Sequence, residues 1–339
     1  MRRLAIPLLA LCLLLCWVIG VALGSVPIPP AKVIAILAAG PTAAGPAPDP
    51  LASIVWGLRA PRVAMGTVVG AALATGGVAL QGMFRNPLAD PYLLGVSSGA
   101  AVGAATAIVA GLGGLLGIGA VPAFAFLGGL GTVWVVWQLA RAGGRGSVTS
   151  LLLAGVAVSA VLSALLSFIL LLSGQMLQGI VVWLMGNLSG RSWSQVAWVG
   201  GYAAVAYAAI WRYRRELNAL TLGEEGALTL GVQVKAVKRN LLAAASLAAA
   251  AAVAMTGVIG FVGLMVPHLL RLLVGPDHAR LLPTSALGGA CLLVLSDTLA
   301  RCLLPPWEIP VGVITALVGG PFFLYLLWHH QSSGWEVGR

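Results

Sequence analysis

The chain has 339 residues, of which 60% are hydrophobic and 8% are charged, and its mean hydropathy is +1.00. These values exclude soluble globular and disordered chains and predict an all-α, polytopic membrane protein. The net charge of +10 does not indicate nucleic-acid binding, because the basic residues gather at the ends of apolar stretches. The four cysteines lack the spacing of metal ligands, so we interpret them as small buried apolar residues.

The apolar stretches predict about ten transmembrane helices. The first apolar run, Leu4 to Leu23, is too long for a signal peptide and precedes no cleavage site, so we expect a retained helix. A Pro/Gly-rich outer segment is expected from Ser25 to Pro50. The further spans are expected at about 63–83, 93–111, 121–139, 149–173, 193–211, 240–255, 281–301 and 311–328, with short helices near 174–193 and 257–275. Basic residues place both termini in the cytoplasm.

One charged segment, Arg212–Arg239, fixes the orientation, because it holds nine charged residues, six of them basic. A short Lys/Arg-rich loop between membrane spans stays in the cytoplasm. Its leucine pattern breaks at Gly223 and again at Gly231, and two glutamates follow the first glycine. This pattern predicts two short helices, the second with carboxylates at its N-terminus and glycine after its C-terminus. We expect a soluble partner to grip this loop.

Catalytic signatures are missing from the sequence. No Lys is followed by Ser or Thr, so a G-x-x-x-x-G-K-[ST] phosphate loop is absent, and no H-E-x-x-H or G-x-S-x-G occurs. Asp297 is almost the only acid within the predicted spans. Ion-coupled transporters usually need acids or unwound ion sites at the midplane, so we expect energy to come from another chain. His268 and His278 have two interpretations, as haem contacts or as structural residues.

Four stretches together resemble the FecCD-type permeases, the membrane subunits of ABC importers for ferric siderophores, haem and vitamin B12. They are Arg59 to Ala100, the LGEEGALTLGV loop, IGFVGLMVPHLLRLLVGPDHARLLP and SDTLARCLLPPWEIPVGVITALVGGPFF. The resemblance implies one permease domain over 1–339, in a homodimer in the bacterial cytoplasmic (inner) membrane. It also implies two cytoplasmic ATPase subunits that bind the ATP, and a periplasmic or extracellular substrate-binding protein. The chain itself would be no enzyme and would hold no cofactor.

The resemblance also implies roles for particular residues. The loop about 212–239 would couple to the ATPase through Leu217, Leu220, Leu222, Gly223, Glu224, Glu225, Ala227, Leu230 and Gly231. The binding protein would dock on Arg59, Arg62 and Arg301, which the predicted topology also places outside. Thr149 and Ser150 would lie near a cytoplasmic gate.

The cargo is not encoded in these motifs, because siderophore, haem and cobalamin permeases share them. We expect an iron chelate, with haem contacts at His268 and His278 as one form of this hypothesis. The alternatives are a cobalamin importer of the same family and a stand-alone secondary transporter.

Overall fold

The computed structural model describes residues 4–24, 26–40, 49–117, 119–142, 148–304 and 306–331. Within these ranges the regular secondary structure is helical, apart from one isolated bridge between Leu304 and Trp307. The all-α prediction is therefore confirmed.

The helices follow one another with short connections. In chain order they are α1 Ala5–Ala22, α2 Pro30–Ala39, α3 Pro50–Ile54, the π-helix η1 Val55–Arg59, α4 Ala60–Phe84, the 3₁₀ helix η2 Pro91–Leu94, α5 Val96–Val109, α6 Leu112–Leu116, α7 Ala120–Ala142, α8 Val148–Leu172, the 3₁₀ helix η3 Gly174–Met176, α9 Leu177–Leu184, α10 Trp193–Arg212, α11 Arg214–Leu220, α12 Glu224–Thr229, α13 Val234–Thr256, α14 Val262–Val274, α15 His278–Cys302 and α16 Val311–Gln331.

Each predicted span contains a helix, and six helices in the described ranges are long and apolar enough to cross a membrane. The chain is thus a multi-pass membrane protein, and the number of ten crossings stays a prediction. The outer segment contains α2, and α3 begins at its last residue, Pro50. The helix expected from about Val63 is α4, which begins at Ala60 and continues a helical run that starts at Pro50. The side chain of Asp49 accepts a hydrogen bond from the N–H of Leu51, which caps this earlier start.

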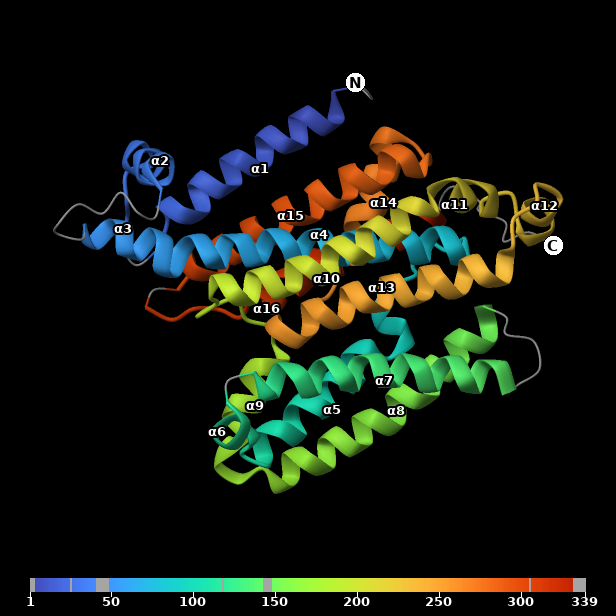
Figure 1. Cartoon of the computed structure of the whole chain (residues 1–339), viewed down its shortest axis with the longest axis horizontal. Helices are drawn as coiled ribbons and strands as arrows, with labels where there is room; N and C mark the ends of the chain where they lie inside the picture. The colour runs from blue at the N-terminus through green and yellow to red at the C-terminus, as the bar shows by residue number, and fades with distance from the viewer. Residues whose placement is uncertain are drawn as a thin grey trace.

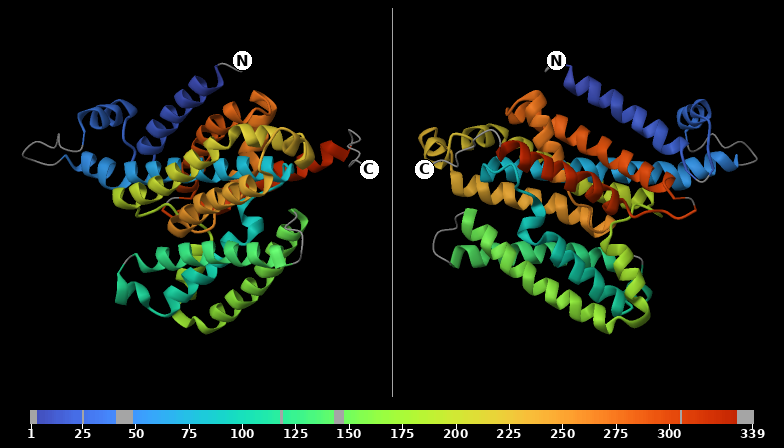
Figure 2. Two further views of the ribbon diagram at one scale, coloured as in Figure 1. Left: turned by 45° about the vertical axis from the view of Figure 1, so that its right-hand side comes forward. Right: turned by 180° about the vertical axis from the view of Figure 1, so that it is seen from behind.

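Two groups of helices lie along the long axis of the molecule (Figure 1). One group contains α4, α10, α13, α14, α15 and α16, with α1 along its edge, and the other contains α5, α7 and α8 (Figure 2). The short helices α11 and α12 lie at one end of the long axis, and α2 and α3 lie at the other. We call these the α12 end and the α3 end.

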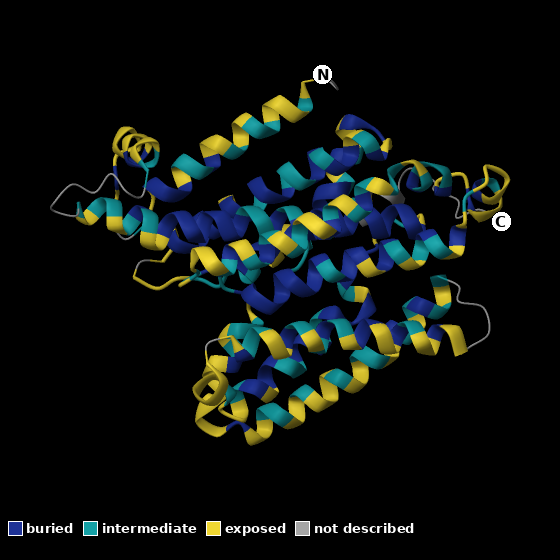
Figure 3. Ribbon diagram, viewed as in Figure 1, coloured by how far each residue is buried: buried dark blue, intermediate teal, exposed yellow. Residues whose placement is uncertain are grey.

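Burial differs sharply between the helices (Figure 3). The most apolar window of the span Pro50–Phe84 is 83% buried, whereas that of α8 is 6% buried. An apolar helix that is exposed all round needs lipid or another protein around it. The helix α4 is therefore the core of this chain, and α8 is a face that something else covers.

Glycines allow α4 to approach its neighbours closely. Gly70 lies against the backbone of Gly289 on α15, and Gly77 lies against the backbone of Gly263 on α14. A Cβ atom at Gly77 would overlap the carbonyl of Gly263. Small residues at such contacts let membrane helices pack backbone to backbone.

This contact predicts the effect of a larger residue at position 77. Gly77→Val should lower the free energy of unfolding by about 1 to 3 kcal/mol, because the carbonyl of Gly263 cannot turn away as a side chain would. Thermal unfolding of the detergent-purified chain measures this. The control is Gly200→Ala on α10, where the added methyl group meets open space. Equal unfolding temperatures for the two variants would contradict the packing described.

Candidate functional site

The segment between α10 and α13 forms two short helices, as predicted. The helix α11 ends at Leu220, Gly223 follows in a left-handed conformation with φ +99°, and α12 begins at Glu224. Glu224 and Glu225 lie in the first turn of α12, and Gly231, with φ +80°, follows its end. Glu224 pairs with Lys238 on α13. The observed connection is shorter than the predicted loop of 212–239, because α10 includes Arg212 and α13 begins at Val234.

The leucines of the segment 212–239, which we call the coupling loop after its predicted role, divide into two sets. Leu217, Leu220 and Ala227 are at most 1% exposed and pack into the main core of the chain. Leu222 and Leu230 are 69% and 63% exposed, and Leu228, which the sequence analysis did not select, is 58% exposed. The buried set anchors the loop to the permease. The exposed set consists of three leucines that the single chain leaves uncovered.

A cavity of about 500 Å³ lies between the coupling loop and the end of α4. Its lining residues are Met83, Phe84, Arg85, Val148, Leu220, Leu222, Gly223, Glu224 and Glu225. Arg85 adopts a left-handed conformation that ends α4, and its guanidinium lies beside Gly223, where a Cβ would come within 2.9 Å of Nη1. The positive φ and this close approach together explain why glycine is needed at position 223.

Asn218 connects the coupling loop to α15. Its Nδ2 donates to Asp277 Oδ1 at 2.8 Å, and its Oδ1 accepts from the backbone N–H of His278 at 2.9 Å. The hydrogen bond from Asn218 is the main reason why the pKa of Asp277 lies below its usual value. Asp277 also caps α15 by accepting from the N–H of Ala279. These hydrogen bonds therefore connect α11 to the first turn of α15.

The two predicted haem contacts occupy different surroundings. His278 is 1% exposed, and its Nδ1 lies 2.6 Å from Asn218 Oδ1, so it belongs to the contact between α11 and α15. This burial leaves no surface of His278 for a cargo, which favours its structural interpretation. His268 is half-buried on α14, with its ring 6.4 Å from that of Phe322 on α16, and its haem contact stays a prediction.

The gate residues lie at the start of α8. Thr149 is exposed and Ser150 is half-buried, and both follow Val148, which lines the cavity beside the coupling loop. Their position agrees with a location near the α12 end. Their role as a gate stays a prediction.

At the α3 end the three predicted docking arginines come together but are not exposed. Arg59, Arg62 and Arg301 are each between 8% and 9% exposed. Arg62 lies in the helix α4 and Arg301 near the end of α15, rather than on loops at the membrane surface. All three guanidinium groups are therefore buried within the single chain. The reason is that the chain supplies internal acceptors for each guanidinium, and the docking role stays a prediction.

One buried carboxylate holds two of these arginines. Asp297 is 2% exposed and accepts from Arg62 Nε and Nη2 at 2.9 Å each, and Arg301 Nε lies 3.3 Å from its Oδ2. Arg62 also donates through Nη1 to Glu308 at 2.8 Å. Burial alone would raise the pKa of Glu308, but the hydrogen bonds from Ser189 and Arg62 outweigh it and lower this pKa. The two guanidinium and two carboxylate groups balance in charge.

Arginines also complete the end of α1. Arg301 Nη2 donates to the carbonyl of Gly20 at 2.9 Å, and Arg59 Nη1 donates to those of Val21 at 2.8 Å and Ala22 at 3.0 Å. The last carbonyls of a helix lack intrahelical partners and carry a partial negative charge. Two guanidinium groups from other helices therefore satisfy the C-terminus of α1.

Sequence motifs assign no role to Asn218, Asp277 and Glu308, and Asp297 stands out in the sequence only as a rare acid. The spacing of Asp297 and Arg301, four residues apart, indicates one ion pair on a helix. The pairing of Arg62 with Asp297 joins residues 235 positions apart, and no local pattern predicts it.

The buried ion pairs predict a strong effect of one neutral substitution. Asp297→Asn leaves two buried guanidinium groups with too little negative charge, so the free energy of unfolding should fall by about 3 to 5 kcal/mol. Thermal unfolding in detergent measures this loss. The control is Lys32→Gln, which breaks the ion pair with Asp49, whose side chains are 46% and 41% exposed; its effect should stay below about 1 kcal/mol. Similar losses for both variants would show that the Asp297 pairs do not hold this end together.

The fold and the comparisons with known proteins define the class of the protein, a membrane permease subunit of the ABC importers for iron chelates, haem or vitamin B12. The chain belongs to the FecCD transport family, whose model matches residues 12–329. Subunits of this class are permeases rather than catalytic chains.

Curated relatives with different cargo names are similar to the chain. The cobalamin import system permease protein BtuC of Halobacterium salinarum is 49% identical over 280 residues, which cover 83% of this chain and 74% of the relative. The hemin transport system permease protein HmuU of Yersinia pestis is 43% identical, over 82% and 84% of the two chains. The Fe(3+) dicitrate transport system permease protein FecD of Escherichia coli is 39% identical, over 79% and 83%.

A solved structure has the same fold. An inward-facing metal-chelate type ABC transporter superimposes with a TM-score of 0.83 and 32% sequence identity, over 97% of this chain and 99% of the other.

Proposed function

We propose that this chain is the permease subunit of an ABC importer that moves an iron chelate, a ferric siderophore or haem, into the cytoplasm. The observation that supports coupling to an ATPase most strongly is the coupling loop, with one set of leucines in the core and Leu222, Leu228 and Leu230 exposed. In this proposal the α12 end faces the cytoplasm, and an ATPase subunit covers the three exposed leucines. The helices number ten across the bacterial cytoplasmic membrane, with both termini inside.

A second copy of the permease completes the proposed assembly. The helix α8 is an apolar helix with a 6% buried window, and a homodimer would cover part of this face and enclose the pathway. Two ATPase subunits would then bind the two coupling loops. The ATP would be held by these subunits.

The substrate-binding protein would dock over the α3 end. Arg62 keeps an ion pair with Glu308, whose side chain is 43% exposed, so a carboxylate of the partner can compete for the same guanidinium. Arg59 and Arg301 hold the end of α1 in place beneath this surface. Thr149 and Ser150 would act at the cytoplasmic gate, close to the coupling loop.

The exposed leucines provide the test of ATPase coupling. The double variant Leu228→Asp and Leu230→Asp should reduce co-purification of the ATPase by about tenfold or more, because a carboxylate buried at an apolar contact costs several kcal/mol. Both side chains are exposed in the permease, so its own unfolding temperature should not change. The measurement is the yield of ATPase in pull-downs with tagged permease.

The matched control is the double variant with Met at both positions, which keeps the apolar surface and should keep the ATPase. Leu220→Asp should behave differently, because Leu220 is 1% exposed and its loss should destabilise the permease itself. An unchanged ATPase yield with the two Asp residues would refute the proposed contact.

The cargo requires its own experiment, because the relatives are named for different cargos. Cobalamin is the alternative cargo, and the 49% identity to a cobalamin permease supports this alternative. Reconstituted permease and ATPase should hydrolyse ATP fastest with a binding protein loaded with its true cargo, and haem, a ferric siderophore and cobalamin are compared in turn. Stimulation by cobalamin alone would replace the iron-chelate proposal. His268→Ala should slow transport of haem only if haem is the cargo.

A further inference from the structure

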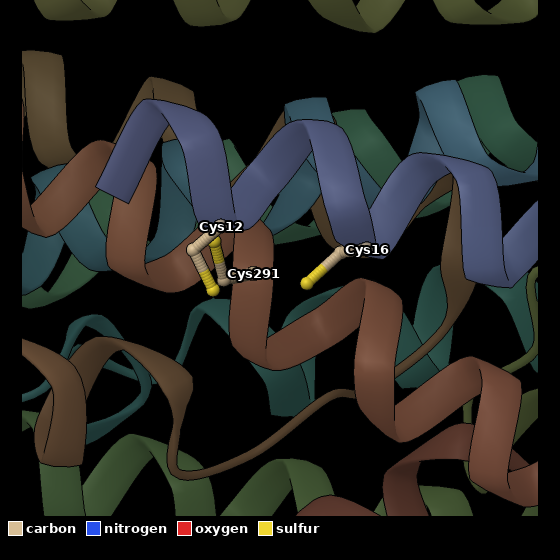
Figure 4. Close-up of side chains that lie close together, drawn as sticks. All are labelled: Cys12, Cys16 and Cys291. Carbon is tan, nitrogen blue, oxygen red and sulfur yellow. The ribbon is translucent and has the colours of Figure 1, made fainter. Parts of the chain in front are cut away.

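Three of the four cysteines meet at the contact between α1 and α15. The Sγ atoms of Cys12, Cys16 and Cys291 all lie within 4.8 Å of one another, although Cys291 is far from the other two in the sequence. Cys12 and Cys16 project from α1 toward α15, which carries Cys291 (Figure 4). The side chains of Cys16 and Cys291 are buried, and Cys12 is exposed at the edge of the contact. Cys12 lies within the span α1, so a ligand reaches the cluster at this edge from the lipid or detergent around the helix.

The ligand set contains only sulfur. Sulfur ligands select soft cations such as Cu(I), whereas hard cations such as magnesium or calcium need oxygen. A metal–sulfur bond of about 2.3 Å would place the three sulfurs of a trigonal site about 4 Å apart. The observed limit of 4.8 Å is close to this value, so rotation of the cysteine side chains suffices to close the site.

The surroundings limit the charge of such a site. Cys16 and Cys291 belong to an apolar cluster with Val21, Val63 and Val294, and α1 contains no charged residue. An uncompensated charge is costly in this environment, so a bound complex should be neutral. A monovalent cation with one thiolate and two neutral thiols meets this condition. A monovalent cation also enters an apolar region at a lower cost than a divalent one, because the solvation cost grows with the square of the charge.

We propose that Cys12, Cys16 and Cys291 form a binding site for one Cu(I) ion. On binding, one S–H bond breaks and its proton passes to the ligand that delivers the ion, the resulting thiolate bonds to the ion, and the other two sulfurs donate lone pairs as neutral thiols. No electron is transferred. The occupied site ties α1 to α15 in the middle of both helices, away from the coupling loop and from the ion pairs at the α3 end. This site is independent of the transport proposal.

Metal binding to the purified full-length chain tests the proposal. The reduced protein in detergent is titrated anaerobically with Cu(I) in competition with the chelator bicinchoninate. The parent should bind one Cu(I) per chain, release one proton and show only sulfur neighbours in copper X-ray absorption. The variants Cys12→Ala, Cys16→Ala and Cys291→Ala should each bind at least about tenfold more weakly.

The fourth cysteine provides the matched control. Cys302 is exposed and lies outside the cluster, so Cys302→Ala should bind Cu(I) as the parent does. Cu(I) should also raise the unfolding temperature of the parent and of Cys302→Ala, but not that of Cys291→Ala. The reason is that the ion stabilises the folded state only where the three-cysteine site is intact. Equal binding by the parent and Cys291→Ala, or loss of binding in Cys302→Ala, would overturn the site. Release of more than one proton would overturn the neutral complex.

Discussion

The need to balance buried charge shapes the α3 end of this protein. A guanidinium group inside an apolar helix bundle is stable only with negative partners or carbonyls around it. Asp297 supplies one carboxylate to two arginines, and Glu308 supplies a second to Arg62. The C-terminal carbonyls of α1 accept from Arg59 and Arg301. The positions of α1, α4 and α15 relative to one another follow from these contacts.

The helix α15 takes part in both ends of the molecule. Its first turn bonds to Asn218 of the coupling loop, and its last turns carry Asp297 and Arg301. Between these ends, Gly289 lies directly against Gly70 of α4. Close backbone contact leaves little room for α15 to move without α4. The two ends of the bundle are therefore connected by one well-packed pair of helices.

The leucines of the coupling loop differ in whether the single chain buries them. Leu217 and Leu220 are buried within the chain, whereas Leu222, Leu228 and Leu230 face outward from the same loop. Exposed leucines do not stabilise a loop in water, because apolar surface contributes stability only when it is removed from water. The exposed set and the apolar face of α8 are among the apolar parts of the described residues that the single chain leaves uncovered.

The sequence by itself determined the all-α class, the approximate helices and the two short helices around Gly223, because hydrophobic length, glycines and charge placement act locally along the chain. The predicted topology also placed Arg59, Arg62 and Arg301 at the same end of the helices. Only the tertiary structure decided that these arginines are buried, since their acceptors Asp297, Glu308 and the end of α1 come from distant parts of the chain. The same holds for the division of the loop leucines and for the meeting of Cys12, Cys16 and Cys291. Burial and contact are properties of packed helices, and no spacing within one helix specifies which neighbour it meets.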